Sequence, residues 1–233
     1  MMQKAPLSIV IPTLNAMPHL VGCLTALVEG LVAGLVCEVI VVDGGSTDTT
    51  VALARDMGCN VVEVGVEARG RGAQLIAGYS AAKGDWLLFL HGDTILQAGW
   101  SAVVLAHLHG AEADKAGYFQ LAFVSGGRRG RRVAALANWR AGAFGLPYGD
   151  AGLVISRTHY QRVGGYRTLT LMEDVDLVRK IGKGGLTGLP VVAQTSAAKY
   201  ERGGWTLVPL RNLTLLAAFL IGVNPTTLAQ WYK

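Results

Sequence analysis

The sequence predicts an α/β fold in which a mostly parallel central sheet is flanked by helices. Two observations predict it: short β-branched runs alternate with helical segments through the first half of the chain, and polar residues follow several of those runs. The chain has 233 residues, 51% of them hydrophobic and 16% charged, which is enough apolar material for one substantial core. We therefore expect one compact domain, with a small C-terminal appendage.

The opening of the chain is predicted to be a βαβ unit. Its first strand covers residues 7–11 and stops at Pro12, and its second covers residues 39–42 and stops at Asp43. Apolar residues recur at helical spacing between them, from residue 18 to about 35. Such a unit predicts two parallel strands joined by a helix.

Helices and strands continue to alternate after this unit. We expect a helix capped by Ser46 or Thr47 and running through Met57, and then, in order, a strand at 61–64, a helix at 73–82 and a strand at 86–90. The second half is less regular, with strands at 117–124 and 153–156, a further helix after the second of these, and an acidic-starting helix at 172–181. Residues 126–132 are predicted to be a mobile glycine-arginine loop. Residues 213–223 are predicted to form an amphipathic or buried helix, since they provide about half of the ~20 residues of a spanning helix.

Charge and cysteine content restrict the function only loosely. A formal net charge of +5 suits a nucleotide diphosphate, an acidic membrane surface, or no particular partner. The basic stretch at 126–132 has no interleaved aromatic residue for base stacking, which argues against nucleic acid. The three cysteines form no metal-binding pattern and are odd in number, and no secretory leader stands at the front. We therefore expect a cytoplasmic protein.

Polar residues gather in three loops that leave predicted strands, at residues 12–15, 43–48 and 91–94. Ligands of open α/β sheets bind beyond the carboxyl ends of the strands, where these loops lie. A single such loop is explained as well by turn and cap chemistry, but three together favour a site. The first strand is not followed by GxGxxG, nor does the chain contain GxxxxGK[ST], which argues against dinucleotide and P-loop chemistry.

These loops resemble the ordered landmarks of glycosyltransferase family 2. The landmarks are SIVIPTLN at 8–15, EVIVVDGGSTD at 38–48, GDWLLFLHGDT at 84–94 and MEDVD at 172–176. The resemblance implies a GT-A (Rossmann-like) domain over residues 1–205, followed by a helical appendage at 206–233. FGLPYGD at 144–150 and LMED at 171–174 are similar to segments of a bacterial subgroup labelled arsenosugar-biosynthesis-type glycosyltransferases.

The resemblance implies metal-assisted, inverting transfer of a sugar from a nucleoside diphosphate sugar, with a UDP-sugar as the expected donor. It places the nucleotide against Thr13, Asn15 and Asp43, whose other explanation is turn chemistry. Arg69 and Arg71 precede a helix, where an arginine fork suits phosphate, although both also fit a solvated surface.

Asp93 matches the last carboxylate of the family's DxD motif, which holds Mg²⁺ or Mn²⁺ across the diphosphate. The first position of that motif is His91 here, so one carboxylate ligand is missing, and His91 is explained as well by a strand-end histidine. Asp174 matches the general base that takes the acceptor proton, and Glu173 would shape the site. The alternative is that both acids merely begin a helix.

Three further residues are expected near substrate. Asp150 is a candidate acceptor contact or a turn residue, and Arg202 and Trp205 resemble a shortened QxxRW element of processive synthases. The expected acceptor is a small molecule or a lipid-linked one at the inner membrane face. Contact with that membrane through residues 126–132 and 215–221 is weighed against a buried helix or a homodimer face.

Two other functions remain open from the sequence. The missing first acid of the metal motif is compatible with a non-catalytic protein that binds nucleotide sugars. A nucleotidyltransferase shares the sheet architecture, but it needs a glycine-rich phosphate loop with a lysine after the first strand, which this sequence lacks.

Overall fold

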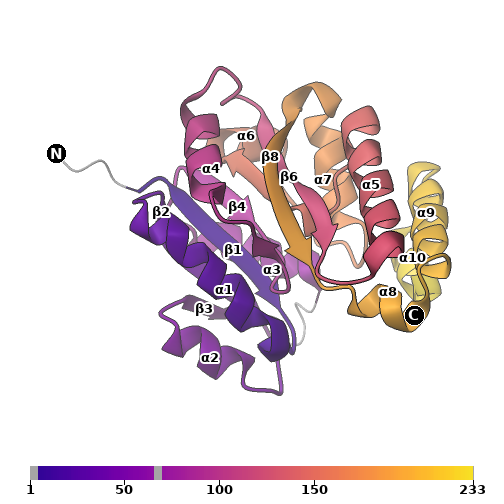
Figure 1. Ribbon diagram of the computed structural model, residues 1–233, viewed down its shortest axis with the longest axis horizontal. Helices are drawn as coiled ribbons and strands as arrows, with labels where there is room; N and C mark the ends of the chain where they lie inside the picture. Colours follow the sequence, from indigo (N-terminus) through magenta and orange to yellow (C-terminus); the bar gives the residue numbers. More distant parts are fainter. Residues whose placement is uncertain (1–4, 66–69, 233) are drawn as a thin grey trace.

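The computed structural model describes residues 5–65 and 70–232. In this part of the chain, eight strands form one sheet in the order β3-β2-β1-β4-β7-β6-β8-β5 (Figure 1). The strands are β1 (Leu7–Thr13), β2 (Val36–Asp43), β3 (Asn60–Glu63), β4 (Trp86–Phe89), β5 (Ile95–Leu96), β6 (Ala116–Phe123), β7 (Leu153–Ser156) and β8 (Leu186–Thr195).

The first half of the sheet is parallel, because β1 pairs in parallel with both β2 and β4, and β2 with β3. In the second half, β7 is antiparallel to β4 and to β6, β6 and β8 are parallel, and β5 is antiparallel to β8. The predicted fold class, an α/β domain with a mostly parallel sheet, is confirmed. The parallel strands bring the loops after β1, β2 and β4 to one edge of the sheet.

The helices are α1 (Met17–Val32), α2 (Thr50–Asp56), α3 (Arg71–Ala81), α4 (Trp100–His109), α5 (Gly127–Phe144), α6 (Arg157–Arg162), α7 (Glu173–Ile181), α8 (Ala198–Gly203), α9 (Leu207–Leu220) and α10 (Pro225–Tyr232). Short 3₁₀ turns occupy Gly149–Ala151 and Lys183–Gly185. None of the helices among the described residues has the length and apolar character needed to cross a bilayer.

Two apolar cores cover the two faces of the sheet. On one face, Ile9, Ile11 and Val41 pack with Leu24 of α1 and Trp100 of α4. Alternate residues of the same strands, such as Val10 and Val42, point to the other face and pack with Leu75 of α3 and Leu177 of α7. Strands buried on both faces explain why the early strands are continuous apolar runs in the sequence.

Two local predictions were wrong. Residues 126–132 are not a loop: Gly126 turns the chain at φ 96° and α5 begins at Gly127, since arginine and alanine are strong helix formers. Neither Ser46 nor Thr47 caps α2, which begins at Thr50 after Thr49. The Ser46 hydroxyl bonds to Asp43 instead. The helices α4 and α8 and the long strand β8 were not predicted as elements, whereas α9 and α10 fall within residues 206–233, which were predicted to be a helical appendage.

Candidate active site

Two hollows meet at the edge of the sheet where β1, β2 and β4 end. The first, which we call the loop cleft, has a volume of about 660 Å³ and lies between the loops after those strands and the start of α3. The second, the tyrosine cavity, has a volume of about 230 Å³ and is lined by Tyr148, Tyr200 and Tyr232. Arg71, His91 and Asp93 line both hollows and therefore stand at their boundary.

Asp43 lies beneath the loop cleft and shapes its floor. Its side chain is only 2% exposed, and it accepts hydrogen bonds from the backbone N–H groups of Gly45 (2.9 Å) and Ser46 (2.7 Å). The hydroxyls of Ser46 and Thr13 also donate to it. Four donors occupy the lone pairs of this carboxylate, so Asp43 holds the loop after β2 in place rather than facing the cleft.

Thr13 and Asn15 line the loop cleft, as the sequence predicted for a nucleotide site. Asn15 takes a left-handed conformation with φ 52°, which asparagine tolerates better than most residues. Its Oδ1 accepts the Thr47 N–H at 2.9 Å, and its own N–H donates to Ser46 Oγ at 2.8 Å. Asn15 therefore links the loops after β1 and β2 into one wall.

Gln74 of α3 is a residue that sequence reasoning missed. Its side chain is 6% exposed, and its Nε2 donates to the carbonyl oxygens of Thr13 (2.7 Å) and Val42 (2.8 Å). One amide thereby joins the ends of β1 and β2 directly below the cleft. The available signal was a polar residue next to Leu75 on the buried side of a predicted helix.

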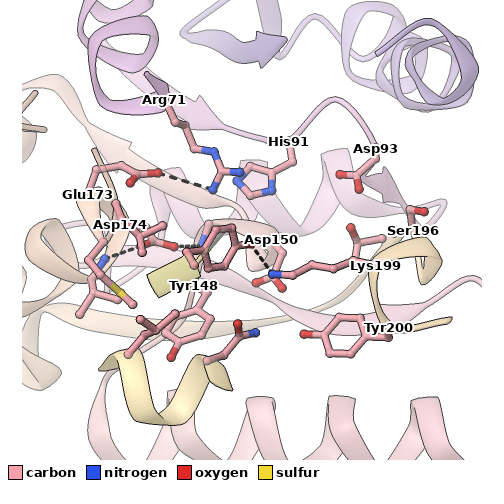
Figure 2. A pocket seen from close by; sticks show the side chains of 18 of the residues that line it. Arg71, His91, Asp93, Tyr148, Asp150, Glu173, Asp174, Ser196, Lys199 and Tyr200 are labelled. Carbon is pink, nitrogen blue, oxygen red and sulfur yellow. Dashed lines mark hydrogen bonds and ion pairs between the residues drawn. The ribbon is translucent and has the colours of Figure 1, made fainter. Parts of the chain in front are cut away.

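Asp174, in the first turn of α7, points into the tyrosine cavity (Figure 2). Its Oδ2 accepts the backbone N–H of Gly149 at 2.8 Å, and its Oδ1 accepts that of Val175 at 2.7 Å. Met172, directly before α7, has φ 67°, a conformation that costs a non-glycine residue of order 1–3 kcal/mol. The chain is held in this turn where the two acids of α7 enter the site.

Gly149 fits closely between the side chains of the site. A Cβ at this position would lie 2.7 Å from His91 Nε2 and 3.5 Å from Asp174 Oδ2. The close approach of the backbone lets the amide of residue 149 hold Asp174 while the imidazole of His91 packs behind it. Asp174 and His91 are thus positioned by the same glycine.

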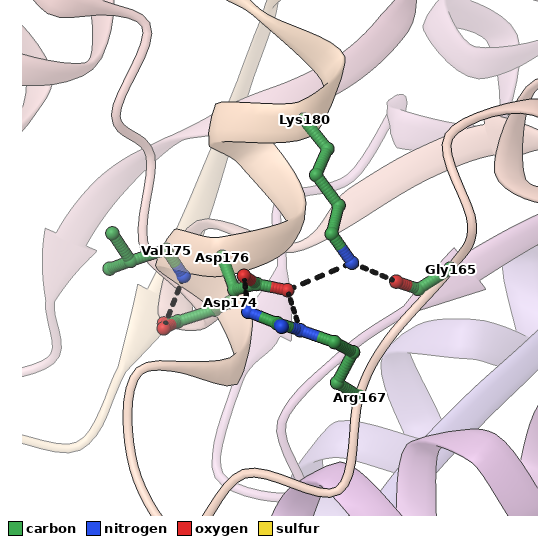
Figure 3. Close-up of polar contacts among 6 residues, drawn as sticks. All are labelled: Gly165, Arg167, Asp174, Val175, Asp176 and Lys180. Atoms are coloured by element: carbon green, nitrogen blue, oxygen red, sulfur yellow. Dashed lines mark hydrogen bonds and ion pairs between the residues drawn. The ribbon is translucent and has the colours of Figure 1, made fainter. Parts of the chain in front are cut away.

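A buried clamp fixes the orientation of α7. Arg167 and Lys180 both reach Asp176, which is buried (Figure 3). Arg167 Nε donates to Asp176 Oδ2 at 3.0 Å, and Lys180 Nζ lies 2.9 Å from the same oxygen. Burial acts to raise the pKa of Asp176, but the bonds from Arg167 and Lys180 outweigh it and lower that pKa.

Glu173 is 3% exposed, and its Oε1 lies 3.5 Å from Nη1 of Arg71. Burial, with the neighbouring charge of Asp174, raises the pKa of Glu173, although Arg71 opposes the rise. For Arg71, which is half-exposed, partial desolvation acts to lower the pKa, but the carboxylates of Glu173 and Asp174 outweigh it and raise that pKa. Arg71 therefore stays charged at the boundary of the two hollows.

His91 and Asp150 are both shifted toward their neutral forms. Burial, and then the charge of Arg71, hold the pKa of His91 well below its usual value, so its imidazole is neutral at pH 7. Burial raises the pKa of Asp150 to about 6; Asp174 and Asp93 add to the rise, and Arg140 and Arg71 oppose it. Asp150 therefore titrates close to neutral pH inside the cavity.

The side chains do not form a protein-only metal cage. Among residues 5–65 and 70–232, no three His, Cys, Asp or Glu side chains come together in a way that could hold an ion. Asp93 supplies one carboxylate and His91 one neutral imidazole. This small donor set fits a hard cation that takes most of its oxygen ligands from a diphosphate and water.

Lys199, Tyr200 and Tyr232 line the tyrosine cavity and were not predicted. Lys199 Nζ donates to the Tyr232 hydroxyl, so α8 and α10 meet across the cavity. Arg202 and Trp205, predicted as substrate contacts, do not line either hollow. Arg202 is exposed, and Trp205 packs on Phe123 and Tyr200, with ring centroids 5.4 and 5.2 Å away. Arg69 lies outside the described residues.

A polar cleft at the ends of parallel strands, next to a cavity with an amide-held aspartate, fits the class of nucleotide-sugar glycosyltransferases. The family-model scan agrees with this class: the model for Glycosyl transferase family 2 matches residues 8–162. The chain therefore belongs to glycosyl transferase family 2.

Solved structures share the fold at low sequence identity. The mannosyltransferase PcManGT from Pyrobaculum calidifontis, in complex with GDP-Man and Mn²⁺, is 19% identical with a TM-score of 0.67, over 99% of this chain and 70% of that one. S. aureus TarS is 16% identical with a TM-score of 0.65, over 94% of this chain and 40% of that one. Glucosyl-3-phosphoglycerate synthase from Mycobacterium tuberculosis, in complex with Mn²⁺, UDP and glucosyl-3-phosphoglycerate, is 23% identical with a TM-score of 0.53, over 82% of this chain and 70% of that one.

The chain thus spans 40% of one TarS chain and 66% of a TarS structure of residues 1–349. A search of curated proteins found no significant match.

Proposed function

We propose that this enzyme transfers the sugar of a nucleoside diphosphate sugar to an acceptor hydroxyl with inversion at the sugar carbon, and that Asp174 is the general base. One observation carries the proposal. The Asp174 carboxylate is fixed by two backbone amides in a cavity that shares Arg71, His91 and Asp93 with the loop cleft. A base on the cavity side and a leaving group on the cleft side are what an inverting displacement requires.

In the proposed reaction, the acceptor oxygen attacks the anomeric carbon from the tyrosine cavity and its proton passes to Asp174. The bond between that carbon and the phosphate oxygen breaks, and the nucleoside diphosphate leaves into the loop cleft. Arg71, charged and half-exposed at the boundary, stabilises the charge that builds on the departing diphosphate. Glu173 holds Arg71 in place for this role.

The loop cleft is the proposed nucleotide site, with Thr13 and Asn15 as contacts and Asp43 as the residue that positions their wall. Its volume of about 660 Å³ lies in the usual range of small-ligand pockets. The PcManGT structure is a complex with GDP-Man, and the glucosyl-3-phosphoglycerate synthase structure is a complex with UDP. We propose a UDP-sugar as the donor here.

We further propose that the reaction uses Mg²⁺ or Mn²⁺. Mn²⁺ is present in the structures of two neighbours. Asp93 would hold the ion, with His91 beside it, and the ion would neutralise charge on the diphosphate. Since the protein offers a single carboxylate here, we expect the metal to bind weakly alone and more tightly together with the donor.

The acceptor site is proposed to be the tyrosine cavity, with Asp150 as a contact. Tyrosine rings and the carboxyl of Asp150, whose pKa is raised, suit a hydroxylated acceptor. This acceptor is either a small molecule or the headgroup of a lipid-linked one. The segments FGLPYGD and LMED, which contribute Gly149, Asp150 and Asp174 to this cavity, support the arsenosugar-biosynthesis-type subgroup. A cytoplasmic location is also part of the proposal.

The proposal is tested by incubating the protein with Mn²⁺ or Mg²⁺ and a panel of nucleotide sugars and measuring release of nucleoside diphosphate. Asp174→Asn keeps the shape of the side chain but removes the base, so turnover should fall by about 10²–10⁴-fold while donor binding persists. Asp93→Asn should weaken metal-dependent donor binding. Tight donor binding without turnover in the wild type, with any acceptor supplied, would instead support a non-catalytic nucleotide-sugar binding protein.

A further inference from the structure

Charge is distributed very unevenly along this chain. No aspartate or glutamate occurs between Asp114 and Asp150, nor after Glu201. The first of these acid-free segments carries Lys115, Arg128, Arg129, Arg131, Arg132 and Arg140, and the second Arg202 and Arg211 before the final residue. The segments contain the whole of α5, α9 and α10. A surface with an excess of positive charge attracts anionic partners.

The acid-free helices lie together on one side of the molecule (Figure 1). Trp205, just before α9, packs at the start of α5: a Cβ on Gly126 would lie 2.3 Å from its ring, and one on Gly130 3.2 Å. The exposed arginines 128, 129, 131 and 132 are in the first two turns of α5. The basic end of α5 therefore adjoins the start of α9.

One side of α9 is an apolar stripe that no described residue covers. Leu207, Leu210 and Leu213 are 70%, 58% and 58% exposed, and Leu220 and Ile221 continue the stripe at 42% and 84%. The spacing of three to four residues places them along one side of the helix. The opposite side of α9, including Leu215, is buried against the protein and lines the tyrosine cavity.

We propose that the α9 stripe and the α5 arginines form one docking surface for an anionic lipid bilayer. Exposed leucines along a helix, next to four clustered arginines, match an interfacial helix that inserts its apolar side between acidic headgroups. One exposed acid, Glu201, borders this surface and accepts the Ser125 hydroxyl at 2.6 Å, so positive charge still exceeds negative charge there. Single exposed apolar side chains are normal on protein surfaces, but the α9 stripe is a continuous apolar patch.

The position of this surface gives it a role in the reaction. Because α9 contacts lipid with one side and lines the tyrosine cavity with the other, docking brings the cavity to the membrane surface. An acceptor carried by a lipid would then reach Asp174 without leaving the bilayer. This last step rests on the proposed function, whereas the docking itself does not.

The test measures binding of the full chain to vesicles by flotation, without donor or acceptor. Vesicles of phosphatidylcholine and phosphatidylglycerol are compared with vesicles of phosphatidylcholine alone. We expect binding only to the anionic vesicles and its loss near 1 M salt, where the screening length is about 3 Å. Arg128→Gln, Arg129→Gln, Arg131→Gln and Arg132→Gln together should weaken binding by about 25–600-fold, since each basic residue that reaches the headgroups contributes about fivefold and two to four of them do so.

Two matched controls separate this surface from bulk charge and bulk hydrophobicity. Lys83→Gln, Arg162→Gln, Arg179→Gln and Lys183→Gln remove the same charge from exposed positions elsewhere and should leave binding within about twofold. Leu207→Ser, Leu210→Ser and Leu213→Ser should abolish stable binding. Val28→Ser, Leu31→Ser and Val32→Ser, which alter exposed apolar residues of α1, should not. Melting curves establish that each variant is folded.

Three results would overturn the proposal: equal binding to neutral and anionic vesicles, equal loss in a control set, or a dimer that dissociates when the α9 leucines are replaced. The last would identify a second copy of the chain as the occupant. Donor turnover is measured separately in the absence of vesicles. A wild-type protein that binds vesicles but shows no donor turnover would count against the proposed function and would leave the docking surface unaffected.

Discussion

Gln74 offers the sharpest test of how the loop cleft is built. Its side-chain amide joins the Thr13 and Val42 carbonyls, and Leu is close to Gln in volume, so Gln74→Leu removes two hydrogen bonds without opening a cavity. Each carbonyl keeps a further partner: Thr13 O accepts the N–H of Gly44 at 2.9 Å, and Val42 O accepts the hydroxyl of Thr13 at 3.4 Å and lies in the β1–β2 ladder where Thr13 pairs with Asp43.

Losing a hydrogen bond at a carbonyl that keeps another partner costs about 0.5–1.5 kcal/mol. Because two such bonds are lost, we expect Gln74→Leu to lower the free energy of unfolding by about 1–3 kcal/mol. In a chain of this size that corresponds to a Tm lower by about 2–12 °C. Donor affinity should fall as well, because Thr13 lines the cleft and its backbone loses this support.

The assay is thermal or denaturant unfolding, together with titration of a nucleoside diphosphate. Gln161→Leu is the matched control: Gln161 is exposed, and its side chain makes one hydrogen bond, to Tyr79. We expect it to change stability by less than about 0.5 kcal/mol. A Gln74→Leu protein with wild-type Tm and wild-type nucleotide affinity would refute the view that this amide holds the strand ends.

Three further predictions follow from the site. Gly149→Ala places a Cβ 2.7 Å from His91 Nε2, so turnover should fall by about 10–100-fold with donor affinity nearly unchanged; full activity would show that the His91–Asp174 spacing is unimportant. The pKa of Asp150 is raised to about 6, so wild-type stability should decrease as pH rises from about 4 to 6. Asp150→Asn should therefore be more stable than wild type by about 2–3 kcal/mol at pH 7–8 and equal to it below pH ~4. Denaturation measured across this pH range tests both expectations. The lowered pKa of Asp176 predicts a stability change of the opposite sign: Asp176→Asn should lower the free energy of unfolding by about 1–3 kcal/mol at neutral pH. This difference from wild type should vanish as acid protonates Asp176. A difference that persists at low pH would contradict the clamp.

Much of the first half of the fold could be predicted from the sequence, for a physical reason. Strands β1, β2 and β4 are buried on both faces, so they are short apolar runs that end at Pro12, Asp43 and His91, and periodicity alone finds them. The same runs place three polar loops at one sheet edge. The acids at 173 and 174 were also identified from the sequence, and both line the cavity.

What could not be predicted depends on long-range packing. Residues 126–132 were wrongly predicted to be a loop because glycine suggested flexibility, whereas positive φ values at Gly126 (96°) and Gly127 (51°) turn the chain from β6 into α5. Lys199 and Tyr232 belong to no local motif, and they meet only because α8 and α10 pack around one cavity. Arg202 and Trp205 were predicted as substrate contacts because they resemble part of a known motif, but their side chains lie outside the lining of both hollows.

Tyr232 has a practical consequence for work on this protein. The aromatic wall that it gives to the cavity comes from α10, which packs on α9 and meets Lys199 of α8. Deleting residues 225–232 would therefore open one wall of the cavity and leave the lining of the loop cleft in place. Binding or kinetic measurements on such a shortened chain would report an altered cavity.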